Sequence, residues 1–269
     1  MNIERVIAYL SVQGILAETK VVKPAFFDPR GEIHGESISW LPFAKQTETE
    51  IDLAGTNAES MSLASMTAVH MLDTYGGLKV LDVCAAPGMK GLYLNSLYDC
   101  VDYCANDLSG DRLARLVRLF ERHGIKPGNI TKYDARFIDR AYPEESFDRI
   151  LIDAPCSGEG VILGGNKKLL EAWSPAKIKR LQQLQIKILK STWKLLKPDG
   201  RLIYATCTLN KNENERVIKK ALGITVNVRE SPLSLELPPG LKHAEAWRIL
   251  PSANSIGFFI AALDKLSDE

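Results

Sequence analysis

A short apolar run, an acid or glycine, and an amphipathic helical pattern recur in this order through most of the 269-residue chain. The apolar runs predict five strands, over residues 79–85, 101–105, 129–133, 147–152 and 201–206. Helical spacing of apolar residues predicts helices between them, over residues 90–97, 112–123 and 178–196. Because parallel neighbours require crossover connections, this alternation predicts an α/β fold with a mostly parallel, doubly wound sheet.

The N-terminal part of the chain departs from this pattern. Residues 1–54 contain one short helical pattern, over residues 3–10, followed by closely spaced prolines and glycines. We therefore predict a small N-terminal appendage of short strands and loops. We expect Phe26, Phe27 and Trp40 to pack this appendage onto the main domain rather than to stack on bases.

The main domain is expected to cover residues 55–269. It opens with a predicted helix over residues 59–74, which a pair of glycines ends. Two further apolar runs near the end of the chain predict strands over residues 224–229 and 257–263. No long helix separates these two strands, so we expect them to form an antiparallel pair at one edge of the sheet.

Composition narrows the class of protein further. Hydrophobic residues make up 45% of the chain and charged residues 25%, which excludes a disordered, collagen-like or coiled-coil protein. No apolar run is long enough to span a bilayer, and the first residues do not resemble a signal peptide. We therefore expect a cytoplasmic protein without a membrane partner, and a monomer by default.

The cysteines are scattered along the chain and lack the paired close spacing of a zinc site. They are Cys84, Cys100, Cys104, Cys156 and Cys207. We therefore expect reduced thiols and no bound metal.

Positive charge is concentrated in one segment, although the formal net charge is only +1. Between positions 167 and 201, only Glu171 and Asp199 oppose a run of basic residues. These are Lys167, Lys168, Lys177, Lys179, Arg180, Lys187, Lys190, Lys194, Lys197 and Arg201. The segment is either a solvated helical face or a surface for phosphates, and the sequence favours neither. A second basic row is expected to be plain surface, and consists of Arg112, Arg115, Arg118 and Arg122.

Two cysteine motifs stand at the ends of predicted strands. The run Asp153-Ala154-Pro155-Cys156-Ser157-Gly158 lies at the sheet edge where open α/β proteins bind ligands. Taken alone, Cys156 is more typical of a small buried residue than of a reactive thiol. Cys207 ends the fifth strand, and parallel topology places the ends of neighbouring strands together. Two thiols beside a carboxylate suggest covalent catalysis, in which a thiolate adds to an electron-poor carbon.

The turn after the first strand predicts a cofactor site. The run Cys84-Ala85-Ala86-Pro87-Gly88-Met89-Lys90-Gly91 combines small residues with the free amides of a helix N-terminus. It lacks the three-glycine spacing of a dinucleotide fingerprint, which disfavours hydride chemistry. Asp107 and Asp134 end the next two strands, where acids can accept hydrogen bonds from ribose and adenine groups. Each acid alone is as typical of a loop or helix cap as of a ligand site. Together with Asp153, however, the two acids favour an adenosine cofactor.

Several runs of this chain occur in an order that is typical of one enzyme family. They are residues 81–88, residues 153–158, Thr206-Cys207-Thr208 followed by Glu213-Asn214-Glu215, and Gly257-Phe258-Phe259-Ile260-Ala261. Over residues 55–263 the chain thereby resembles the NOL1/NOP2/Sun family of RNA cytosine-C5 methyltransferases. The resemblance implies a Rossmann-like fold, S-adenosylmethionine as cofactor and RNA as partner.

The resemblance also implies a role for each site residue. The methionine portion of the cofactor would be held by Cys84, Ala85, Ala86, Pro87, Gly88, Met89 and Lys90, with Arg112 beside the site. Asp107 would bind the ribose, Asp134 the adenine, and Asp153 would face both cofactor and cytosine. Cys207 would add to cytosine C6 so that C5 takes the methyl group, and Cys156 would help to break the adduct. The base must be unstacked to reach such a pocket.

The chain departs from the family pattern in three places. Met89 and Gly91 replace the usual second glycine and the residue after the lysine, while Lys90 remains. Ala58 and Glu59 stand where a glutamine and an acid are usual. The family's N-terminal Arg-x-Asn element is not recognisable in residues 1–50.

The leading hypothesis is therefore an RNA cytosine-C5 methyltransferase. Transfer RNA, the substrate of archaeal-type members, is preferred slightly over ribosomal RNA, because the chain is compact and shows no additional RNA-binding domain. One alternative is an RNA-binding assembly factor that has lost turnover, which the retention of both thiols disfavours. The other is a DNA cytosine methyltransferase with its nucleophile in the pair Pro155-Cys156, which the Thr206-Cys207 motif disfavours.

Overall fold

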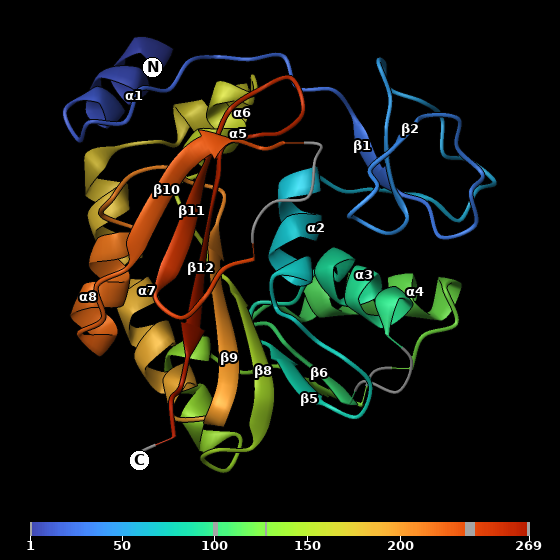
Figure 1. Ribbon diagram of the computed structural model, residues 1–269, viewed down its shortest axis with the longest axis vertical. Coiled ribbons are helices and arrows are strands. Elements are labelled where there is room, and N and C mark those ends of the chain that lie inside the picture. Colours follow the sequence, from blue (N-terminus) through green and yellow to red (C-terminus); the bar gives the residue numbers. More distant parts are fainter. Residues whose placement is uncertain (1, 99–101, 127, 235–239, 268–269) are drawn as a thin grey trace.

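A central sheet of eight strands runs in the order β10-β11-β12-β9-β8-β5-β6-β7 in the computed structural model (Figure 1). The structure describes residues 2–98, 102–126, 128–234 and 240–267. The strands are β5 (Lys79–Asp82), β6 (Asp102–Asn106), β7 (Asn129–Thr131), β8 (Phe147–Asp153), β9 (Leu196–Thr206), β10 (Asn227–Pro232), β11 (Glu245–Leu250) and β12 (Phe258–Asp264).

The five strands from β5 to β9 form the parallel part of this sheet. β5 pairs with β6 and β8, β6 pairs with β7, and β8 pairs with β9, each in the parallel sense. Helices α3 (Met89–Leu97) and α4 (Gly110–Arg122) follow β5 and β6, and α7 (Pro175–Trp193) precedes β9. The predicted alternation of strands and helices is confirmed, and with it the predicted α/β fold class.

Alternate residues of each central strand point to opposite faces of the sheet, and each face carries its own core. Leu151 and Ile203 pack with α3, α4 and α2 (Leu63–His70) on one face. Ile150 and Leu202 pack with α7 and α8 (Glu215–Leu222) on the other. Helices on both faces explain why the central strands are apolar throughout.

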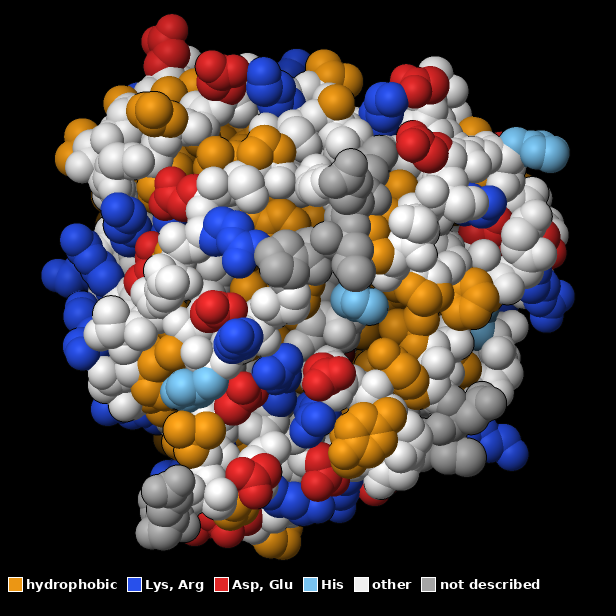
Figure 2. Space-filling view, viewed as in Figure 1, with side chains coloured by type: hydrophobic (Ala, Val, Ile, Leu, Met, Phe, Trp, Pro, Cys, Tyr) orange, Lys and Arg blue, Asp and Glu red, His pale blue; other side chains and the backbone are white. Residues whose placement is uncertain are grey.

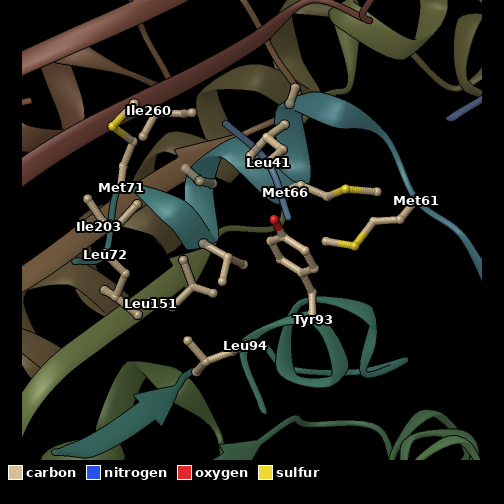
Figure 3. Close-up of a cluster of buried hydrophobic side chains, with 14 of the residues drawn as sticks. Leu41, Met61, Met66, Met71, Leu72, Tyr93, Leu94, Leu151, Ile203 and Ile260 are labelled. Carbon is tan, nitrogen blue, oxygen red and sulfur yellow. The ribbon is translucent and has the colours of Figure 1, made fainter. Parts of the chain in front are cut away.

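The face under α2 is filled by methionine and aromatic side chains. Figure 3 shows Met61 and Met66 gathered near Tyr93 of α3 in this layer. All three side chains are at most 5% exposed. Full burial of one such side chain contributes about 1.5–3 kcal/mol. α2 is therefore held to the sheet by packing, although it is short.

Two helices begin at serine caps that shift their starts from the predicted positions. Ser174 accepts a hydrogen bond from the Lys177 amide, so α7 begins at Pro175 rather than at residue 178. Ser62 caps α2 in the same way, so this helix begins at Leu63 rather than at residue 59.

The predicted antiparallel pairing of residues 224–229 with residues 257–263 is wrong. β11 lies between β10 and β12, and it pairs parallel with β10 and antiparallel with β12. β12 is antiparallel to β9 as well, so the sheet does contain the predicted antiparallel strand. The sequence pattern missed β11 because Arg248 interrupts its apolar run, yet Arg248 is fully buried and forms ion pairs with Glu215 and Glu230.

The N-terminal residues form two separate pieces. Helix α1 (Ile3–Ser11) packs Val6 and Leu10 against Leu163 and Trp173 of the main domain, beside α5 (Glu159–Leu163) and α6 (Lys167–Glu171) (Figure 1). A small antiparallel sheet follows, in the order β2-β3-β1-β4. Its strands are β1 (Ala25–Phe27), β2 (Glu36–Ser37), β3 (Ala44–Gln46) and β4 (Glu59–Ser60).

The aromatic residues of this N-terminal region are buried, as predicted. Phe26, Phe27 and Trp40 are at most 6% exposed, and Phe27 stacks edge to face with Tyr93 of α3. Phe27 and Trp40 join the core of the main domain and pack the small sheet onto it, as predicted. Phe26 does not, because it packs with Ile33 and Ala58 in a separate cluster. The boundary between residues 54 and 55 stays a prediction. None of the helices in the described ranges has the length and apolarity that a bilayer crossing needs.

Candidate active site

The two cysteine loops leave neighbouring parallel strands. Asp153 at the end of β8 lies opposite Ala205 of β9, so the chain continues into Cys156 and Cys207 at the same sheet edge. Their Sγ atoms are 3.2 Å apart, and both residues are free cysteines that are partly exposed. The topology thus brings the thiols together as the sequence predicts.

A pocket of about 420 Å³ opens beside the thiols. The predicted site residues that line it are Cys84, Asp107, Arg112, Asp134, Asp153, Cys156 and Cys207. Its apolar wall includes Leu169, Leu184 and Ile188 of α6 and α7, which the sequence analysis did not single out. The pocket therefore joins all three strand-end acids with both thiols.

The turn between β5 and α3 is held by Asp107. Its carboxylate accepts a hydrogen bond from the Ala86 amide at 3.2 Å and forms an ion pair with Arg112 at 3.1 Å. Arg112 also donates to the carbonyl of Ala86. Gly88 has a φ of +112°, and a Cβ atom there would lie 3.0 Å from Leu116. The turn therefore requires glycine at position 88.

Not every predicted cofactor residue faces this pocket. Ala85 and Ala86 are buried in the turn. Pro87 and Met89 instead line a separate groove of about 480 Å³, together with Arg115, Arg118 and Arg122 of α4. Lys90 is not among the pocket-lining residues and acts through its contact with Asp153.

Lys90 and Asp153 form the ion pair closest to the thiols. Their side chains are 13% and 34% exposed, and the Nζ–Oδ2 distance is 2.6 Å. Burial alone would lower the pKa of Lys90, but the Asp153 carboxylate, together with Asp82 and Cys207, outweighs it, and the pKa is raised. Lys90 is therefore a cation, and its charge also interacts with Cys207.

A further acid, Asp82, interacts with both members of this pair. Burial raises the pKa of Asp82 to about 7, although the charge of Lys90 acts in the opposite direction. Asp82 also accepts a hydrogen bond from the Tyr103 hydroxyl at 3.1 Å. This region thus holds two acids for one lysine.

Cys156 is held in its protonated form. The hydrogen bond to Cys207, followed by burial, raises the pKa of Cys156 well above its usual range. Cys156 therefore keeps its proton at neutral pH and can donate it toward Cys207. Burial likewise raises the pKa of Cys84, which is an inert wall of the pocket.

The Asp134 carboxylate lines the pocket but is already paired with a neighbouring arginine. Arg136 binds it through several hydrogen bonds, which lower the pKa of this carboxyl. The same Arg136 lines a second groove of about 440 Å³ with Lys177, Arg180 and Lys187 of α7. Leu184 lines both this basic groove and the thiol pocket, so the two are adjacent.

Part of the predicted basic segment is neutralised. Lys194, Lys197 and Arg201 form ion pairs with Asp139, Asp148 and Asp264 respectively. Figure 2 shows further Lys and Arg side chains along the left edge of the molecule, where Figure 1 places α8. Arg216, Lys219 and Lys220 of α8 are exposed.

A buried polar network behind the thiols is the main feature that sequence reasoning missed. Glu159 and Glu213 are both fully buried and share Ser157 and Asn210 as hydrogen-bond partners. Glu213 belongs to the Glu-Asn-Glu run of the family motif, but nothing in that run indicates burial.

The strand order, the antiparallel β12 beside β9 and the pocket at the carboxyl ends of the parallel strands define a class I methyltransferase fold. Within this class, the chain belongs to the 16S rRNA methyltransferase RsmB/F family, whose sequence model matches residues 69–264.

Individual relatives agree with this assignment. The chain is 36% identical over 255 residues to ribosomal RNA small subunit methyltransferase B of Klebsiella pneumoniae, covering 86% of this chain and 57% of that protein. A methyltransferase homolog protein from Pyrococcus horikoshii has a TM-score of 0.73 at 26% identity, covering 92% of this chain and 88% of that one. NSun6 from the same organism, solved with SFG, has a TM-score of 0.68 at 26% identity, covering 84% and 60%. The chain spans about half the length of the curated relatives it matches.

Proposed function

We propose that the protein methylates C5 of cytosine in RNA, with S-adenosylmethionine as the methyl donor. The observation that carries this proposal is the pair of free thiols 3.2 Å apart at a pocket lined by three strand-end acids. Family membership supports it, because the matching family is described as a 16S rRNA methyltransferase.

The pocket fits an adenosine cofactor. Its volume of about 420 Å³ lies in the range of small-molecule sites, and it combines an apolar wall with a few polar groups. In the proposal, the turn at residues 84–90 holds the methionine portion, Asp107 the ribose and Asp134 the adenine. The related NSun6 was solved with SFG, an analogue of S-adenosylmethionine, which supports this use of the pocket.

Cys207 is the proposed nucleophile. Its thiolate forms a bond to cytosine C6, and the electron pair displaced from the C5–C6 double bond makes C5 nucleophilic. The cofactor supplies the electrophilic methyl group. The Asp153 carboxylate accepts a hydrogen bond from the amino group of the base, or from N3 when N3 carries a proton in the adduct, and so holds the ring in place. The cation of Lys90, 2.6 Å from Asp153, keeps that carboxylate oriented.

Cys156 is the proposed release residue. Because its pKa is raised, it carries a proton at neutral pH and lies within reach of the Cys207 sulfur. After methyl transfer, water takes the C5 proton, the electron pair of the C5–H bond restores the C5–C6 double bond, and the bond between C6 and the Cys207 sulfur breaks. A neutral Cys156 beside the leaving sulfur stabilises the departing thiolate by donating a hydrogen bond.

Two lines of argument point to different RNA substrates. The names of the relatives specify ribosomal RNA of the small subunit, whereas the sequence alone led to a slight preference for transfer RNA. We propose ribosomal RNA as the first substrate to test and keep transfer RNA as the second. A cytoplasmic location is part of the same proposal.

The two competing functions fit the pair of thiols less well. An assembly factor without turnover has no use for two apposed thiols, and a DNA enzyme would place its nucleophile at Cys156, whose raised pKa suits a proton donor better.

Bisulfite sequencing tests the proposal directly. Total RNA from cells that lack this protein is incubated with it, with and without S-adenosylmethionine, and then sequenced. We expect new cytosine-C5 methylation only with the cofactor, at a defined position in ribosomal or transfer RNA. The absence of any new methylated cytosine in RNA would contradict the proposal.

A further inference from the structure

A closed network of polar side chains connects the two thiol loops. Ser157 follows Cys156, and Thr208 follows Cys207. The hydroxyl oxygens of Ser157 and Thr208 are 2.9 Å apart, and both residues are fully buried. The loops are therefore joined directly behind the sulfur atoms.

Two acids lie at the centre of this network. Glu159 and Glu213 are 0% exposed, and in the described part of the chain neither forms an ion pair with Lys, Arg or His. The Asn210 amide nitrogen lies 2.9 Å from Glu159 Oε1 and 2.9 Å from Glu213 Oε1. Two unpaired carboxylates at such a spacing cannot both ionise without a large cost.

The hydrogen-bond donors distinguish the two acids. Trp173 Nε1 donates to Glu159 Oε1 at 3.0 Å, and the Leu209 amide donates to Glu159 Oε2 at 3.1 Å. Both oxygens of Glu159 therefore accept bonds, as expected for a carboxylate.

Glu213 has one oxygen that suits a proton. Its Oε2 accepts bonds from the Ser157 amide at 3.0 Å and from Gln185 at 2.9 Å. Its Oε1 faces the Ser157 hydroxyl, whose oxygen is also 2.9 Å from Glu159 Oε1. A proton on Glu213 Oε1 lets Glu213 donate to Ser157, and Ser157 then donates to Glu159.

We propose that Glu159 and Glu213 are positioning residues, which share one proton through Ser157 and thereby hold Cys156 and Cys207 at their close spacing. Only the catalytic benefit of that spacing rests on the proposed function. The proton is held by Glu213 and the negative charge by Glu159. Loss of the proton replaces an attraction between the two loops by a repulsion.

Among the residues that the structure describes around this proton, none supplies a competing cation. Cys156 and Tyr204 of β9 face Glu213, and Tyr204 donates to the Glu213 carbonyl at 2.7 Å. Tyr9 approaches from α1, and Arg216 of α8 acts on Tyr9. Arg248 of β11 donates to the Leu209 carbonyl and is already paired with Glu215 and Glu230.

The titration of Glu213 supplies the test. Burial, with the charge of Glu159 as the second cause, raises the pKa of Glu213 from 4.5 to about 7. The unfolded chain ionises near 4.5 and the folded chain near 7, so the stabilisation is complete below 4.5 and is lost as the pH rises to 7. Glu213→Gln cannot ionise; it keeps the donor toward Ser157 and the acceptor at the Oε2 position, and gives up only the bond that Oε1 accepts from Asn210.

The first measurement compares melting temperatures of the wild type and Glu213→Gln between about pH 5 and pH 8. We expect the wild type to lose several degrees relative to the variant across this range. Glu121→Gln, a change on the exposed face of α4, serves as control and should follow the wild type. Asp82, whose pKa is also about 7, is present in all three proteins and cancels. Parallel curves for the wild type and Glu213→Gln would overturn the proposal.

The second measurement reads the thiol spacing without any methyl transfer. Dibromobimane fluoresces when it bridges two neighbouring thiols, and Cys156→Ala sets the background. We expect Glu213→Gln to be bridged as fast as the wild type, and Glu213→Ala at least several-fold more slowly. Bridging of Glu213→Ala at the wild-type rate would contradict the positioning role. Because neither measurement needs RNA, failure of the proposed function would leave both results intact.

Discussion

At the scale of the residue, the packing around Gly91 explains why glycine replaces the residue that the family motif usually has after the lysine. A Cβ atom at this position would lie 2.2 Å from the hydroxyl of Tyr103 and 2.9 Å from Phe120. Tyr103 is 1% exposed and donates to Asp82 at 3.1 Å, so its ring cannot move aside. The space that a side chain at position 91 would need is therefore filled by Tyr103.

Gly91→Ser should destabilise the protein by about 1–3 kcal/mol, because it overpacks this contact. Urea unfolding measures the loss. Gly110→Ser is a matched control within α4, since its Cβ atom would come no closer than 3.5 Å to Lys132. Equal stability of the two variants would show that Tyr103 does not exclude a side chain at position 91.

At the scale of the element, α7 separates two kinds of basic residue. Lys177, Arg180 and Lys187 line the groove beside the thiol pocket. Lys194, which follows the end of α7, and Lys197 are each held by an aspartate. The charge run that looks uniform in the sequence thus offers cations to a phosphate chain only in its first part.

Replacing Lys177, Arg180 and Lys187 with alanine should weaken RNA binding and flatten its dependence on salt. Each lost contact with single-stranded RNA should reduce the slope of log K against log[salt] by about 0.7. A matched control replaces three paired lysines, Lys194, Lys197 and Lys265, with the same change in net charge. Affinity measured over a salt series decides the matter. A larger effect of the control than of the groove variant would count against the groove as the RNA surface.

At the scale of the whole molecule, parallel topology brings Cys84, Asp107, Asp134, Asp153, Cys156 and Cys207 to one pocket. This much was predictable, because an apolar run followed by an acid or thiol marks the end of a buried parallel strand. Sequence order then places those ends at one edge of the sheet. The family motifs add the roles that we propose for these residues.

Other features could not be predicted, for identifiable physical reasons. β11 was hidden because a buried arginine, Arg248, breaks its apolar pattern. The strands of the small sheet have only two or three residues, too few for any periodicity. Glu159 and Glu213 look like surface acids in the sequence, and only the tertiary contacts show that they are buried. The predicted edge pairing failed because it depended on the missing strand.

Covalent trapping on RNA tests the central claim most directly. In Cys156→Ala, Cys207 can still attack the base, but the adduct should break slowly, so a slow-migrating protein–RNA band should appear on a denaturing gel with S-adenosylmethionine. Cys207→Ala and the double variant should give no such band, and Cys104→Ala, which replaces a free cysteine outside the pocket, should behave as the wild type. A band in Cys207→Ala that disappears when Cys156 is also replaced would contradict the account, because it would make Cys156 the nucleophile.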